Sequence, residues 1–240
     1  MTASQVPLRP EQIKAAQAIY SNYTEDWRRT DAALADLKEK MPGFKSSAAL
    51  VKAAAVNSLY GTNVYAISAA ARRVEDLLDG KNLRSAGPEL VEEMASIRLP
   101  EGKVRHCPSF ASKFAHFFID YDRFPIYDSY AVKMLRDHLG HDALASEPTY
   151  MAFEKAFRTL AREVDLGSDT RQLDRYLWIV GEYREWLKNP KSVHSELRRQ
   201  VFETDPQPPE LKDAARGVVS RVTVNLKRRS HNRYHRRSRA

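Results

Sequence analysis

The sequence predicts an all-α fold, and three observations lead to that prediction. Apolar residues recur at three- and four-residue spacing along most of the chain, as Phe110, Phe114 and Phe117 do. Signals that start and stop helices separate these segments, such as Pro42 followed by Gly43. No segment shows a convincing alternation of period two, so we expect no strand of any length.

About nine to eleven helices are expected. Pro10 suits the first turn of the first one, after an unstructured lead-in over residues 1–9. Thr30 is expected to cap the second helix, and Gly140 to close the helix that follows Pro125. Further helices are predicted over residues 48–60, 63–78, 88–96, 149–164, 170–188, 192–202 and 210–216, and two more between 108 and 139.

These segments divide the chain into three parts. Residues 1–190 are expected to form one helical body, because a chain of 240 residues is long enough to bury a sizeable core. Residues 191–225 are expected to form a helical extension that contains a proline-rich linker. Residues 226–240 form a basic tail that we expect to be disordered.

The formal net charge of +8 is concentrated in that tail. The chain before residue 227 carries a net charge of only about +1. Tyr234 lies among the basic residues, a pattern that favours a polyanionic partner, most commonly nucleic acid. The alternative is a solvated end without a partner. The tail residues predicted to bind DNA are Lys227, Arg228, Arg229, Arg233, Arg236 and Arg237. Arg239 is the seventh basic residue of the tail.

Several classes of protein do not fit this composition. Cys107 is the single cysteine, which excludes an intrachain disulfide and a four-cysteine metal or iron–sulfur site. No residues show zinc-ligand spacing and no glycine-rich phosphate loop is present, so no metal or cofactor is expected. No apolar run approaches the roughly 20 residues that span a bilayer, and the N-terminus lacks signal-peptide character. We therefore expect a cytoplasmic, nucleoid-associated monomer.

Two polar residues stand out in the apolar stretch between residues 108 and 139. Lys113 lies at the edge of the phenylalanine stripe, where burial would lower its pKa and favour nucleophilic attack. The alternative is a lysine that extends along the apolar face to solvent. Asp128 follows Pro125 closely, at the start of the next helix, where a carboxylate either caps the helix or faces a cleft. His116 is expected to be a satisfied core histidine.

The order of these elements resembles the helix-hairpin-helix DNA glycosylase superfamily, which includes the endonuclease III-like and 8-oxoguanine glycosylases. The resemblance covers roughly residues 45–190. The polar turn Asn57–Asn63 matches the turn that faces the lesion, the segment around Lys113 matches the hairpin helix, and Pro-Ile-Tyr-Asp128 matches the aspartate loop. It implies a two-lobed helical domain with a central cleft.

The hairpin departs from the family pattern, because it contains a single glycine, Gly102, where the family is glycine-rich. We expect Lys103, Arg105 and His106 to take over the phosphate contacts. Tyr127 is an extra residue in the aspartate loop.

The resemblance also implies roles for residues of the cleft. Asp128 would stabilise the cation that forms on the sugar, and Lys113 would be the nucleophile in a bifunctional enzyme. Thr62 and Asn63 would contact the base or its orphaned partner, although an ordinary turn explains them equally well. The aromatic residues predicted to stack on an extruded base are Tyr60, Tyr127, Tyr130 and Trp178, and the alternative for each of them is the core.

The sequence therefore predicts a DNA glycosylase that removes a modified base from double-stranded DNA, with or without lyase activity. The first alternative is a non-catalytic helical nucleic-acid-binding protein on the same scaffold. The second is a helical protein-interaction module with a basic tail, which leaves Lys113 and Asp128 unexplained.

Overall fold

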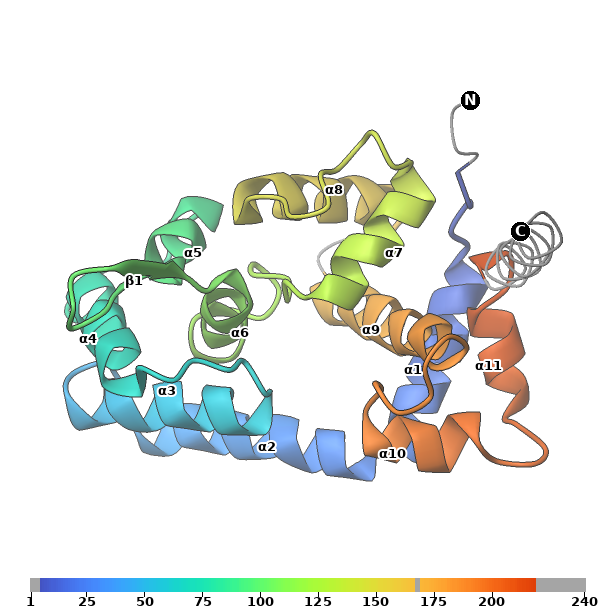
Figure 1. Ribbon diagram of the computed structural model, residues 1–240, viewed down its shortest axis with the longest axis horizontal. Helices are drawn as coiled ribbons and strands as arrows, with labels where there is room; N and C mark the ends of the chain where they lie inside the picture. The colour runs from blue at the N-terminus through green and yellow to red at the C-terminus, as the bar shows by residue number, and fades with distance from the viewer. Residues whose placement is uncertain (1–4, 167–168, 219–240) are drawn as a thin grey trace, which may run out of the picture.

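A computed structural model describes residues 5–166 and 169–218 of the chain, and it confirms the all-α prediction (Figure 1). These residues contain eleven α-helices, a five-residue π-helix and a two-stranded antiparallel hairpin. The first half comprises α1 (Pro10–Tyr23), α2 (Glu25–Lys40), α3 (Ser47–Leu59), α4 (Ile67–Leu78), α5 (Pro88–Ala95), β1 (Ser96–Arg98) and β2 (Val104–His106). The second half comprises α6 (Pro108–Phe118), α7 (Ser129–Leu139), α8 (Tyr150–Glu163), α9 (Thr170–Trp186), α10 (Ser195–Leu197), the π-helix η1 (Arg198–Phe202) and α11 (Pro209–Ala214).

Helix α6 lies in the left half of the view, between α5 above it and α3 below it (Figure 1). It packs against α5, α3 and α2, and its rings Phe110 and Phe114 are fully buried. Helix α9 packs against α1 and α7, and α11 packs against α1. Leu211 of α11 belongs to the same apolar core as the phenylalanines of α6. The helical extension after residue 190 is thus joined to the core.

The predicted start of the second helix at Thr30 is wrong, because α2 begins at Glu25. The carboxylate of Glu196 accepts hydrogen bonds from the backbone N–H groups of Asp26 and Trp27, at 2.7 and 3.3 Å. Those groups belong to the first turn, which has no partners within the helix. The cap is therefore supplied by a residue far along the chain, and no local signal announces it.

Two further predictions are corrected by local detail. Helix α4 begins at Ile67 rather than near Asn63, because Asn63 adopts a positive φ of 56° and Asn57 Oδ1 accepts a hydrogen bond from the Val64 N–H at 2.8 Å. The connection before α6 contains strands β1 and β2 where no strand was expected. Each strand has only three residues, too few for an alternating pattern to be recognised.

No helix in residues 5–166 and 169–218 is both long enough and apolar enough to cross a membrane.

The close approach of α7 and α9 depends on Gly181. A Cβ atom at this position would lie 2.7 Å from Tyr130 Cβ and 3.3 Å from Tyr130 Cα. The glycine therefore lets α9 lie directly against the first turn of α7, next to Asp128.

We predict that Gly181→Ala destabilises the protein. Alanine gains about 1 kcal/mol of helix propensity over glycine, but overpacking against atoms at the backbone costs about 1–3 kcal/mol. The expected net result is a loss centred on about 1 kcal/mol, and of at most about 2 kcal/mol, in the free energy of unfolding, measured by urea titration. An unchanged or raised unfolding midpoint would show that the two helices have room to separate.

Candidate active site

A cavity of about 540 Å³ lies between the helices around α6. Its wall is formed by residues of α1, α2, α6, α7 and α9, by the C-terminal end of α3 and by the segment that precedes α10. Its volume lies within the roughly 300–1,000 Å³ that is usual for small-molecule pockets.

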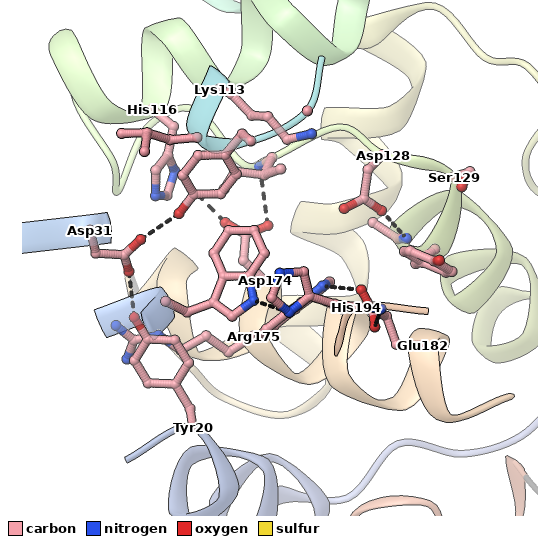
Figure 2. Close-up of a pocket in the computed structure, with 18 of the residues that line it drawn as sticks. Tyr20, Asp31, Lys113, His116, Asp128, Ser129, Asp174, Arg175, Glu182 and His194 are labelled. Carbon is pink, nitrogen blue, oxygen red and sulfur yellow. Dashed lines mark hydrogen bonds and ion pairs between the residues drawn. The ribbon is translucent and has the colours of Figure 1, made fainter. Parts of the chain in front are cut away.

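Lys113 and Asp128 both line this cavity, and Figure 2 shows their side chains on the same side of it. Lys113 is only 8% exposed, and its Nζ donates a hydrogen bond to Ser109 Oγ at 2.9 Å. Burial lowers the pKa of Lys113 below its usual value, and the negative charge of Asp128 partly opposes this effect. The amine is therefore partly prepared for the neutral, nucleophilic form.

Asp128 is the N-cap residue of α7. Its Oδ1 accepts a hydrogen bond from the Ala131 N–H at 2.7 Å, and its side chain is half-buried against the cavity. The capping role and the cavity role considered from the sequence are therefore both realised by one side chain. The N-terminus of a helix is also an electrostatically favourable place for a carboxylate.

His116 also lines the cavity but is already engaged. Its Nδ1–H donates a hydrogen bond to the Phe124 carbonyl oxygen at 2.9 Å, and burial lowers the pKa of the imidazole to about 4. It is thus a neutral, satisfied core histidine, as the sequence predicted.

The aromatic part of the wall is organised around Trp27, which the sequence analysis did not select. Its ring centroid lies 4.8 Å from that of Tyr60, 5.0 Å from that of Trp178 and 4.9 Å from that of His194. Trp27 Nε1 donates a hydrogen bond to His194 Nδ1 at 3.0 Å, which fixes the indole. Flat rings of this kind suit a planar aromatic ligand.

Two acidic residues of the cavity wall, Glu182 and Asp31, accept hydrogen bonds from aromatic side chains. Trp178 Nε1 and the His194 backbone N–H donate to Glu182 at 2.9 and 2.8 Å, and burial raises the pKa of this carboxyl to about 7. Asp31 accepts hydrogen bonds from the hydroxyls of Tyr20 and Tyr60. These contacts orient the aromatic side chains that face the cavity (Figure 2).

Of the six residues predicted to contact the base, the cavity brings together Tyr60, Tyr130 and Trp178. The other three lie outside its lining. The Thr62 hydroxyl bonds to Asn57 Oδ1 at 2.8 Å, Asn63 is exposed in the turn, and Tyr127 packs its ring 5.1 Å from that of Phe153. Arg171 and Arg175 line the cavity instead and add positive charge that the sequence analysis did not assign.

The predicted phosphate contacts Lys103, Arg105 and His106 are exposed on the β-hairpin and do not line the cavity. The guanidinium of Arg105 lies 5.6 Å from the centre of the Tyr65 ring, and Tyr65 is 85% exposed. The tail residues Lys227, Arg228, Arg229, Arg233, Arg236 and Arg237 lie outside the described residues.

Within the described part of the chain, no three His, Cys, Asp or Glu side chains are grouped so that they could hold a metal ion. The lining of the cavity contains amine, carboxylate, guanidinium and aromatic groups.

A family model described as HI_0787_N, an N-terminal domain, matches residues 11–122, slightly less than half of the chain. The matched region includes α6 and Lys113 but ends before Asp128. No curated protein matches the chain, and no solved structure does.

Proposed function

We propose that this protein is a DNA glycosylase of the helix-hairpin-helix type, with two helical lobes around a central cleft, and that it excises a modified base. The observation that carries the proposal is the placement of Lys113 and Asp128 in one aromatic-lined cavity. The aromatic wall suits a base that has been rotated out of the duplex, since such a base is bound by stacking and by hydrogen bonds to its edge.

The chemistry follows from the charges. The bond between C1′ and the base nitrogen breaks with its electron pair on the base, which leaves positive charge on the sugar. The Asp128 carboxylate stabilises that charge, because a fixed opposite charge in a water-poor site acts strongly. The neutral amine of Lys113 then bonds to C1′ through its lone pair and loses one proton, which neutralises the departing base. The nitrogen lone pair next expels O4′ from C1′, which opens the sugar ring, and O4′ takes up the second amine proton. The imine that results permits strand cleavage.

The test uses duplexes that each carry one modified base, together with a duplex that carries an abasic site. The abasic duplex already exposes C1′, so it reports on Lys113 whatever the natural base is. Borohydride reduces an imine to a stable amine, and the proposal predicts a covalent protein–DNA adduct. Duplex binding without excision or adduct would favour the alternative, a non-catalytic nucleic-acid-binding protein.

The β-hairpin and the turn beside it are the proposed surface for the duplex. Lys103 and Arg105 supply positive charge, and the exposed ring of Tyr65 is available to stack on a base. The turn that carries Tyr65 follows Gly61, which lines the cavity. Phosphate contacts on this side would bring a base near the cavity.

We predict that Tyr65→Ala weakens binding to an abasic duplex by about tenfold, whereas Tyr65→Phe retains it, because base stacking contributes about 1–3 kcal/mol per base.

Lys103→Ala and Arg105→Ala should each reduce the slope of log K against log salt by about one. Fluorescence anisotropy at several salt concentrations measures both effects. The control is Lys40→Ala, an exposed lysine of α2 paired with Asp36, which should leave the slope unchanged. Equal slopes in all the lysine and arginine variants would exclude the hairpin as the duplex surface.

A further inference from the structure

The segment from Phe124 to Asp128, which leads into α7, has no regular secondary structure. Side chains from three helices nevertheless form hydrogen bonds with its backbone at four successive residues. Two of the bonds are donated to backbone carbonyls: His116 Nδ1–H donates to the Phe124 carbonyl at 2.9 Å, and the Tyr150 hydroxyl donates to the Pro125 carbonyl at 2.9 Å. The other two are donated by backbone amides: the Ile126 N–H donates to Asp174 Oδ1 at 3.1 Å, and the Tyr127 N–H donates to Ser112 Oγ at 3.0 Å.

These four side chains, Ser112, His116, Tyr150 and Asp174, are called the clamp below. All four are buried, so water does not readily replace a bond that is lost. A buried backbone needs partners in any case. In this segment the partners are buried side chains of α6, α8 and α9, so the backbone is held against three helices at once.

The clamp is also continuous with the cavity, because His116 and Asp174 are part of its wall. Asp128 comes directly after the clamped residues, and its carboxylate interacts electrostatically with the Lys113 amine. A shift of the segment would therefore move Asp128 relative to Lys113. We infer that Ser112, His116, Tyr150 and Asp174 are positioning residues that hold Asp128 opposite Lys113, an inference that rests on the proposed function.

Asp174 needs only one acceptor oxygen for this role. Its Oδ1 accepts from the Ile126 N–H, while its Oδ2 has no hydrogen-bond partner among the described residues and lies 3.9 Å from His116 Nδ1. Burial raises the pKa of this carboxyl well above its usual value. An asparagine has the same shape and keeps an oxygen acceptor for the Ile126 amide, whereas a leucine does not.

The first test measures the pKa of Lys113, because this value reports how near the Asp128 charge lies. The probe is the pH dependence of the Lys113 side-chain signal in NMR spectra of the reductively methylated protein. Tyr150→Phe and Ser112→Ala each remove one clamp bond without changing charge, and both should lower the pKa of Lys113, as Asp128→Asn does. Combining Tyr150→Phe with Asp128→Asn should lower it no further than Asp128→Asn alone.

The matched control is Tyr176→Phe. Tyr176 is as buried as Tyr150, and its hydroxyl is bonded to His138 Nε2 at 3.0 Å, away from the clamp. Its loss costs a similar buried hydrogen bond, but we expect it to leave the pKa of Lys113 unchanged. If Tyr150→Phe and Tyr176→Phe affect that pKa equally, or neither affects it, the clamp does not position Asp128.

The second test measures the rate of borohydride-trapped adduct formation with the abasic duplex. Tyr150→Phe and Asp174→Leu should slow it by about ten- to a hundredfold, since displacements near 1 Å can cost a hundredfold. Asp174→Asn should react at nearly the wild-type rate, and duplex affinity should stay the same in all three. If wild-type protein neither excises a base nor forms an adduct, the proposed function fails, and the pKa of Lys113 still tests whether the clamp positions Asp128. If it forms an adduct and the clamp variants match it in rate and in pKa, the clamp alone is refuted.

Discussion

Asp128→Asn should reduce base excision by at least about a hundredfold while leaving the protein folded. Asparagine caps a helix about as well as aspartate, so the hydrogen bond from Ala131 can be kept and α7 should still begin at Ser129. What is lost is the negative charge that, under the proposed function, faces the developing sugar cation. Single-turnover excision on the duplex panel measures the rate, and thermal unfolding checks the fold.

Asp169→Asn is the matched control for this change. Asp169 caps α9 in the same way, accepting from the Gln172 N–H at 3.4 Å, but does not line the cavity. The same chemical change at this helix start should therefore leave excision unaffected. If both variants lose activity equally, the loss reports helix capping rather than the charge of Asp128.

Most of the helices were predictable because their signals are local. The periodic phenylalanines of α6 predict a buried face, and Phe110 and Phe114 are indeed inaccessible to solvent. Asp128 follows a proline at the expected distance and caps α7. The start of α2 was not predictable, because its cap is Glu196, which no local pattern connects to Trp27. Local sequence signals indicate where a helix begins and ends. They do not indicate which distant residue will hydrogen-bond to the helix end in the folded protein.

The cavity was predictable only in part for the same reason. Trp27, His194 and Tyr60 meet from three separate segments, and only tertiary packing brings their rings within 5 Å of the indole. A usable signal did exist on α9, where polar or aromatic residues recur at helical spacing along an otherwise buried helix. These residues, all of which line the cavity, are Arg171, Asp174, Arg175, Trp178 and Glu182. Such a stripe predicts a polar cavity more specifically than any single residue in it.

Lys113→Met should abolish the borohydride-trapped adduct and, at the same time, raise the free energy of unfolding at pH 7. Methionine has no nucleophile but is of similar length and is apolar, so it suits a site in which burial disfavours the ammonium form. The adduct is measured on denaturing gels with the abasic duplex, and stability by urea titration. A variant that still forms the adduct would assign the nucleophile elsewhere.

The pH dependence of stability provides a second measurement on the same residue. The pKa of Lys113 is lower in the folded protein than the ordinary value of 10.5, so the unfolded chain binds a proton that the folded protein has released. Between those two pKa values the free energy of unfolding therefore rises with pH. Lys113→Met removes this contribution, and its stability should depend less on pH in that window.

Lys52→Met separates the effect of burial from the effect of the site. Lys52 is 1% exposed, burial lowers its pKa, and its Nζ donates to the Gly43 carbonyl at 2.7 Å, but it does not line the cavity. The same substitution therefore removes a second buried amine and should leave adduct formation at the wild-type rate. If both methionine variants lose the adduct, the loss reflects a general effect of replacing a buried lysine, and it does not identify Lys113 as the nucleophile. If Lys113→Met alone loses the adduct, the chemistry is assigned to the amine that shares its cavity with Asp128.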